Sequence, residues 1–213
     1  MNWIKLSIPV FVFHATSAWI HAQEEPTPQR FKMGLKLGPM TSQMSGDGLG
    51  GFDKFGAVAG AQVRATINDR SRVSLGMEYM SKGSRAPIDT INHTTFAYRL
   101  HYIQIPINWH YSYSNRLQFH GGLYAGYLIH QSVMANKLVY TITEYGGQPG
   151  FNSWDIGAQC GVQFVLNDNN GLIMDFGQSI LPIRDNPAQT NQYSFYEGGN
   201  YNSTLSLAWL HTF

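Results

Sequence analysis

Large apolar and polar residues alternate along most of the chain after residue 30. Between Ile103 and Tyr111 every second residue is Ile, Trp or Tyr, and the residues between them include Gln104, Asn108 and His110. Successive side chains of a β-strand point to opposite faces, so a period of two predicts a strand with one apolar and one polar face. The same period recurs in further segments up to the last residues of the chain.

The predicted strands are joined by connections of two kinds. Short turns near 68–71, 112–115 and 167–170 alternate with long connections rich in Gly, Asn, Ser and Pro. This alternation is typical of even-stranded transmembrane barrels, which have tight periplasmic turns and long outer loops. We therefore predict an all-β fold, an eight-stranded antiparallel up-and-down transmembrane β-barrel. The expected strands are 31–41, 55–68, 72–83, 98–113, 116–130, 153–166, 171–183 and 202–213.

The two faces of these strands differ in charge. Charged residues within the strands lie opposite the larger apolar side chains, so the apolar face is nearly free of charge. A membrane barrel turns its apolar face outward to lipid, whereas a soluble barrel of the lipocalin type turns it inward. Aromatic residues near the strand ends favour the membrane barrel, which carries interfacial aromatic girdles. These residues are Phe31, Phe55, Tyr79, Trp109, Tyr111, Trp154 and Phe213.

Glycines gather on the polar face. A small barrel has a narrow interior that leaves little room for side chains, so this placement also favours a polar lumen. The glycines are Gly34, Gly38, Gly56, Gly60, Gly76, Gly122, Gly126, Gly157 and Gly161.

Composition excludes several classes of protein. Charged residues make up 13% of the chain, whereas a soluble domain has about 25%. The 14 Lys and Arg residues are balanced by 13 Asp and Glu residues, so no nucleic-acid partner is expected. The single cysteine, Cys160, excludes an intramolecular disulfide and a cysteine-based zinc site. No cofactor is expected.

The N-terminus reads as a secretory signal peptide over residues 1–22. Lys5 precedes an apolar run from Leu6 to Ala15, and small residues lead to a cleavage site expected after Ala22. Residues 23–30 form a short polar periplasmic segment, and the barrel domain is expected over 31–213. The alternative, a short membrane anchor, is disfavoured because the apolar run is too short.

Several segments resemble one family of outer-membrane barrels. Residues 102–107, Tyr-Ile-Gln-Ile-Pro-Ile, resemble the Tyr-x-x-Ile-Pro segment of the PorT-like barrels of Bacteroidetes. The segments 34–38, 76–79 and 82–84 and the terminal Phe213 are similar to the same pattern. The resemblance covers about 31–213. It implies an integral protein of the cell outer membrane, surrounded by outer-membrane lipid, with eight antiparallel strands.

The resemblance also implies partners. The terminal aromatic residue resembles the signal that the barrel-assembly machinery reads during insertion. The founding member of the family is associated with the type IX secretion system, so proteins of a secretion complex are expected as partners.

Charged residues on the polar face are the candidate site. In an eight-stranded barrel the lumen is just wide enough to be filled by side chains, and buried charges need partners. We expect these residues to pair with one another as a plug, the alternative being a proton path or a ligand site. The predicted lumen charge network is Arg64, Glu78, Lys82, Asp155 and Asp175.

Histidines recur at 101, 110, 120 and 130, following the strand repeat rather than a metal-ligand spacing. We expect His101 on the apolar face and the other three in the lumen, with no metal site. An enzyme would need a serine, a histidine and a carboxylate together, for which Ser74, Glu78 and His120 are candidates. No Gly-x-Ser-x-Gly motif is present. Pro106 is expected to mark a bulge or a bend.

These observations predict a non-enzymatic outer-membrane barrel that serves as a membrane anchor or an assembly partner, with a possible link to type IX secretion. The alternatives are a narrow solute channel, a lipid-modifying outer-membrane enzyme and a soluble exported ligand-binding barrel. Recognition of a partner is expected in the connection 184–201, where aromatic and polar residues mix, unless it is a merely solvated loop.

Overall fold

The computed structural model describes residues 31–86, 95–136, 138–141, 150–185 and 198–213. The predicted signal peptide 1–22, the segment 23–30 and most of the connection 184–201 lie outside the described residues. None of the described residues belongs to a helix long and apolar enough to cross a membrane.

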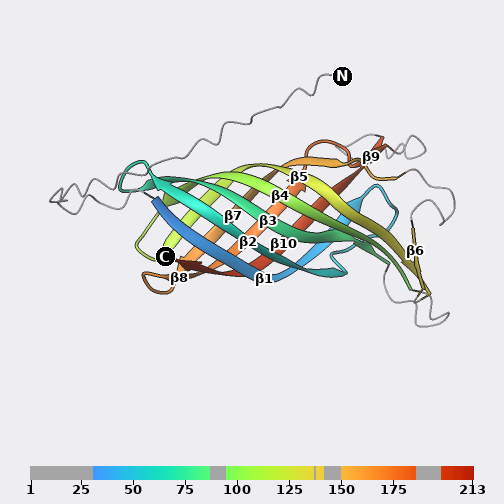
Figure 1. Ribbon diagram of the computed structural model, residues 1–213, viewed down its shortest axis with the longest axis horizontal. Helices are drawn as coiled ribbons and strands as arrows, with labels where there is room; N and C mark the ends of the chain where they lie inside the picture. Colours follow the sequence, from blue (N-terminus) through green and yellow to red (C-terminus); the bar gives the residue numbers. More distant parts are fainter. Residues whose placement is uncertain (1–30, 87–94, 137, 142–149, 186–197) are drawn as a thin grey trace, which may run out of the picture.

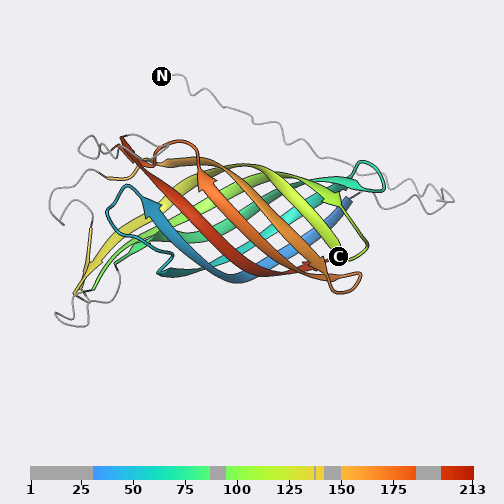
Figure 2. The ribbon, with the colours of Figure 1, turned by 180° about the vertical axis from the view of Figure 1, so that it is seen from behind.

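Eight long strands close into one barrel (Figures 1 and 2). Each pairs antiparallel with the next, and the last long strand pairs with the first, which confirms the predicted closed, eight-stranded antiparallel barrel. Two short strands, β6 (Leu138–Tyr140) and β9 (Arg184–Asp185), add to β5 and β10. The long strands are β1 (Phe31–Ser45), β2 (Lys54–Thr66), β3 (Ser71–Arg85), β4 (Phe96–Ser112), β5 (Leu117–Ala135), β7 (Trp154–Val165), β8 (Asn170–Ser179) and β10 (Gly199–Thr212).

The three short turns are built in the same way. The side chain of Asn68 accepts hydrogen bonds from the backbone N–H groups of Arg70 and Ser71, at 3.0 and 2.8 Å. Asn167 and Ser114 accept the equivalent bonds in the other two turns. Such side-chain bonds replace ladder bonds where a strand reverses. All three turns lie at the end of the barrel where β1 begins and β10 ends (Figure 1), called here the turn end; the opposite end is the loop end.

Three neighbouring strands continue beyond the others at the loop end. β3, β4 and β5 extend to Arg85, Phe96 and Ala135, past the ends that alternation predicted. They form a projecting sheet, to which β6 adds one more strand (Figure 1).

The alternation of inward and outward side chains breaks down near the loop end of β5, because this strand contains a β-bulge. His101 pairs with His130 but Tyr102 pairs with Leu128, so Ile129 is an extra residue. An extra residue reverses which face the following side chains occupy. His130 is therefore exposed on the outer surface, and its predicted position in the lumen is wrong.

Pro106 was expected to mark a bulge or a bend, and the pairing of β3 with β4 shows no bulge there. Leu75 pairs with Ile107 and Glu78 with Gln104, so the register of β3 against β4 is the same on both sides of the proline. Pairing of Gly76 and Met77 with β4 is interrupted, because proline has no N–H to donate. A local gap in the ladder takes the place of a bulge.

The wall of the barrel is apolar outside and polar inside. Leu37, Met77 and Leu123 point outward and are 65%, 60% and 61% exposed. The lumen-facing residues are instead buried, and most of those near the turn end and at mid-height are polar or charged. A soluble barrel would show the inverse arrangement, so an apolar surrounding is needed to cover this wall.

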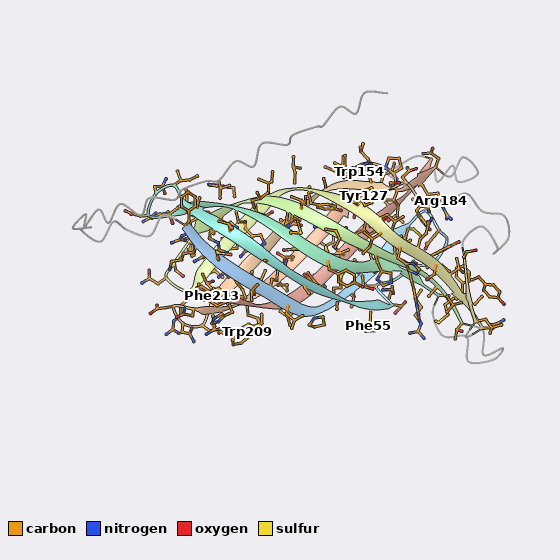
Figure 3. The ribbon with its side chains drawn as sticks, in the orientation of Figure 1. Phe55, Tyr127, Trp154, Arg184, Trp209 and Phe213 are labelled. Carbon is orange, nitrogen blue, oxygen red and sulfur yellow. The ribbon has the colours of Figure 1, made fainter. Side chains whose placement is uncertain are left out.

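Two groups of aromatic side chains stand on the outer surface (Figure 3). Trp209 and Phe213 lie toward the turn end, whereas Phe55, Tyr127 and Trp154 lie toward the loop end. All five are between 47% and 74% exposed. Two separated belts of amphipathic rings, with an aliphatic wall between them, are the arrangement that a membrane with two interfaces selects.

Candidate functional site: the polar lumen

The centre of the lumen holds a cluster around Lys36 of β1. Its Nζ lies 2.8 Å from Glu78 Oε1 of β3 and 2.8 Å from Asp175 Oδ2 of β8. The other oxygen of Asp175 contacts His120 Nε2 of β5 at 2.5 Å. One buried cation thus joins two carboxylates from strands on different sides of the barrel, which holds the strands together across the lumen.

A second cluster, nearer the loop end, is centred on Lys82 and Asp155. The ammonium of Lys82 lies 2.9 Å from Asp155 Oδ2 and donates a second bond of 2.7 Å to Gln104. Asp155 also accepts bonds from Ser179 at 2.7 Å and from Asn202 at 3.0 Å. The pair is fully surrounded by partners, which is what a buried ion pair needs to offset its desolvation.

Lys82 is held on its remaining sides by aromatic rings. Its Nζ lies 4.4 Å from the ring centroid of Tyr124 and 5.2 Å from that of Tyr102. Gly157 makes room for the first ring, because a Cβ at this position would lie 2.4 Å from the Tyr124 ring carbon Cζ. The glycine predicted on the polar face therefore allows a large side chain from a neighbouring strand to fill the lumen.

Arg64, near the turn end, has a different environment. Its guanidinium donates to the amide oxygens of Gln163 at 2.9 Å and Gln118 at 3.4 Å. Its Nε has no partner among the described residues although it is buried. Arg64 is thus the member of the predicted set that meets neutral groups in place of a carboxylate.

The loop end of the lumen is closed by apolar side chains. Arg184 packs against two of these side chains: its guanidinium carbon lies 4.6 Å from the Phe151 ring centroid and 5.3 Å from that of Tyr98 (Figure 3). Its Nε donates a hydrogen bond to the side chain of Asn200. The apolar plug consists of Met44, Tyr98, Leu100, Tyr102, Val133, Phe151 and Ile183. Leu100, Tyr102 and Ile183 are 0% exposed, so little space is left for water.

The predicted charge network is divided between separate clusters. Lys82 and Asp155 form a direct pair, whereas Glu78 and Asp175 share Lys36, which the predicted network did not include. Arg64 lies apart from all of them. The sequence carried one signal for Lys36, its place on the polar face, but its partners lie 42 and more residues away and only the register brings them together.

The histidines and the candidate catalytic residues are not arranged for catalysis. Ser74 Oγ lies 2.7 Å from His110 Nε2, whereas His120 contacts Asp175 and Glu78 contacts Lys36. Ser74 and His110 are each 2% exposed. Among the described residues, no group of three or more His, Cys, Asp or Glu side chains could hold a metal ion.

A basic cluster lies at the loop end, where the start of β2 meets the projecting parts of β3 and β4. Lys54, Arg85 and Arg99 line a cavity of about 270 Å³ together with His101. Lys54 Nζ is held by the backbone oxygen and the hydroxyl of Ser81, both at 3.0 Å. The lining of the cavity also includes Phe55, Ala97 and Met134, but no Asp or Glu among the described residues. The cluster therefore joins cations to an aromatic side chain of the loop-end belt.

These features define a class of protein: a closed β-barrel with an apolar wall, two aromatic belts and a filled polar lumen is an outer-membrane barrel. The sequence profile described as Outer membrane protein beta-barrel domain matches residues 21–181. The chain belongs to this family and lies in the outer membrane. No curated protein matches the chain at a significant level.

Solved structures show the same fold. A crystal structure of Ail, the attachment invasion locus protein of Yersinia pestis, in complex with the heparin analogue sucrose octasulfate, superposes with a TM-score of 0.53 at 15% identity. The match covers 86% of this chain and 99% of that chain. Another crystal structure of Ail gives a TM-score of 0.51 at 11% identity, over 85% of this chain and 98% of that chain.

Proposed function

We propose that this protein is a non-conducting, non-enzymatic barrel that anchors an interaction surface in the outer membrane. The observation that carries the proposal is the filled lumen: Lys82 and Asp155 are each 0% exposed, and the apolar plug, with Tyr102 also at 0%, lies between this pair and the loop end. A solute would have to break the ion pairs and displace the plug together. Function then depends on the outer surface and the loops.

Conductance of the purified protein in planar lipid bilayers tests this proposal. The expected result is no stable single-channel step, with a general-diffusion porin as the positive control under the same conditions. A steady open-channel current from a heat-modifiable, folded preparation would contradict the proposal and favour the narrow channel.

The absence of an enzymatic role rests on the placement of the candidate nucleophile. Ser74 and His110 are buried inside the lumen, so the wall of the barrel separates them from lipid ester bonds. The histidine Nδ1 has no partner among the described residues, so no carboxylate orients the ring as in a hydrolase triad. Assay of purified protein with lipid A and phospholipids should give no product; release of fatty acid that Ser74→Ala abolishes would favour the lipid-modifying enzyme.

The resemblance to PorT-like barrels supports a finer proposal, a role in a type IX secretion complex. Deletion of the gene in its host, followed by measurement of cargo proteins at the cell surface, tests this role. The expected result is cargo retained in the periplasm and restored by the wild-type gene. Normal delivery of cargo in the deletion strain would contradict it.

The basic cluster of Lys54, Arg85 and Arg99 favours a second candidate function, binding of a polyanion at the cell surface. Three cations line one cavity with no carboxylate among its described residues, and sulfate groups bind to such clusters through charge-assisted hydrogen bonds. The similar Ail structure holds sucrose octasulfate, which is a suitable probe. Arg85→Gln and Arg99→Gln should weaken its binding, whereas Arg116→Gln, at an exposed turn of the other end, should not; equal loss in all three would contradict a localised site.

A further inference from the structure

A cavity of about 230 Å³ opens at the turn end of the lumen, on the side opposite the apolar plug. Its floor is formed by Arg64 of β2, with Gln118 of β5 and Gln163 of β7. The remaining lining comes from strand ends, which include Lys32 and Arg72, and from the turn between β7 and β8, which includes Asp168.

Arg64 is a buried cation without a buried anion. It is 9% exposed, and its described hydrogen bonds go to the neutral amide oxygens of Gln118 and Gln163. The other lumen cations, Lys36 and Lys82, each pair with a carboxylate at 2.8 or 2.9 Å. A buried charge that lacks an opposite charge is costly, and Arg64 also leaves its Nε without a partner among the described residues.

The lining around Arg64 contains further hydrogen-bond donors. Gln118 and Gln163 use their amide oxygens to accept from the guanidinium, and both also line the cavity, so each has an NH₂ group that is chemically able to donate to an anion. Lys32 and Arg72 add two further cations at the rim, and Asp168 is the carboxylate of the lining. The ion pairs among the described residues involve none of Lys32, Arg64 and Arg72.

We propose that this cavity binds a phosphate group. Arginine presents a planar fork of donors that matches phosphate oxygens, and an anion would supply the charge that Arg64 lacks. The volume corresponds to several water molecules of about 30 Å³ each, so a phosphate with one small ester substituent fits. Two sources share this chemistry: a free phosphate compound of the periplasm and the headgroup of an inner-leaflet phospholipid.

The position of the cavity makes both sources accessible. The turn end is the periplasmic end of barrels of this class, and the aromatic belt with Trp209 and Phe213 lies near this end of the barrel (Figure 3). Lipid headgroups are found at the level of such a belt. The cavity thus opens close to the headgroup layer and to the periplasm.

Isothermal titration calorimetry of the whole folded protein in dodecyl maltoside, which contains no phosphate, tests the proposal. The probes are inorganic phosphate, glycerol 3-phosphate and a short-chain phosphatidylglycerol. Binding of any of them that weakens as salt is added supports the site. Tighter binding of the lipid identifies the headgroup source, and equal or tighter binding of the free compounds identifies the periplasmic source.

Variants make the test specific. Arg64→Gln should weaken binding about tenfold or more, and Arg64→Lys should restore only part of it because the ammonium lacks the fork. If Arg64→Gln does not fold, Lys32→Gln and Arg72→Gln at the rim carry the test, each with a loss of a few-fold. Arg116→Gln is the matched control, since Arg116 is an exposed cation in another turn at the same end and does not line the cavity.

The proposal is overturned if no probe binds the wild-type protein, or if Arg116→Gln weakens binding as much as the rim variants do. The second result would show general attraction to a basic end of the barrel. Neither result depends on whether the barrel conducts ions or catalyses a reaction.

Discussion

Lys82 Nζ lies 2.9 Å from Asp155 Oδ2, and both side chains are almost completely removed from solvent. The two residues are 73 positions apart in the chain and belong to β3 and β7, which are not neighbours in the barrel. The pair therefore spans the lumen and links opposite sides of the wall. Lys82 also donates a hydrogen bond to Gln104, and Asp155 accepts hydrogen bonds from Ser179 and Asn202, which completes the cluster.

Removal of one partner of this pair should destabilise the barrel strongly. Lys82→Met leaves the Asp155 carboxylate buried without a cation, so the free energy of unfolding should fall by about 3–5 kcal/mol. Urea unfolding of the protein in lipid vesicles measures the change. Lys32→Met, an exposed lysine, is the control and should change little. A loss for Lys82→Met below that of the control would contradict the role assigned to the pair.

Glycine 157 is needed because of the Tyr124 ring. Gly157→Ala places a Cβ about 2.4 Å from that ring and 2.3 Å from the Gln178 carbonyl oxygen, so overpacking should cost about 1–3 kcal/mol. Gly121→Ala is a matched substitution, because its Cβ would have no neighbour closer than 3.7 Å. Heat-modifiability on gels and urea unfolding of both variants test the difference; equal stability would contradict the packing described.

A charge on the outer wall should be poorly tolerated at mid-height. Leu123 is 61% exposed and pairs with Ile107 and Ala158 in the middle of the wall. Leu123→Arg should lower the free energy of unfolding in vesicles by about 2–4 kcal/mol because the guanidinium meets hydrocarbon. Ile67→Arg, at a turn and 62% exposed, should cost about 1 kcal/mol or less. A reversed order would contradict the placement of the membrane.

Asp47, in the connection between β1 and β2, should give a pH-dependent contribution to stability. Burial raises the pKa of its carboxyl above the usual value of 3.8, against the smaller opposing effects of the hydrogen bond from the Leu49 N–H and of the Arg184 charge. The folded protein then holds this proton more tightly than the unfolded chain, so its contribution to stability falls as the pH rises above 3.8.

Asp47→Asn removes the titrating carboxyl. The amide oxygen of the new side chain can still accept the hydrogen bond that the Leu49 N–H donates to Asp47 Oδ1 at 2.8 Å in the wild type. The variant should match the wild type below pH 3.8 and become the more stable of the two above it. Unfolding of both proteins over a pH series measures the difference. A wild type that gains stability over the variant with rising pH would show the opposite shift of the pKa.

Alternation alone identified the eight strands and the inward and outward faces of most of them. Alternation worked because the lipid-facing side of each strand tolerates no charge. The pattern on that side can therefore be recognised in this sequence, although the chain is only 15% identical to a solved barrel. It failed beyond Leu128, where the extra residue Ile129 reverses the faces. A bulge leaves no composition signal in a single sequence, which is why His130 was misplaced.

The partners inside the lumen could not be predicted in the same way. Arg64 and Lys36 are both basic residues on the polar face, yet Lys36 meets two carboxylates and Arg64 meets two glutamines. The difference arises from strand tilt and register, which set the height of each side chain along the barrel axis. Sequence spacing carries no information about height across strands that are far apart in the chain.

The closed barrel and its membrane surroundings could both be inferred from the amino-acid sequence, because both follow from the period of two and from the absence of charge on one face of each strand. The tertiary structure alone decided which charges pair, that apolar side chains close the loop end, and that Arg64 faces a cavity at the turn end. These features depend on closure of the sheet, since only closure brings β1 against β10 and places residues of β3 and β7 within contact across the lumen.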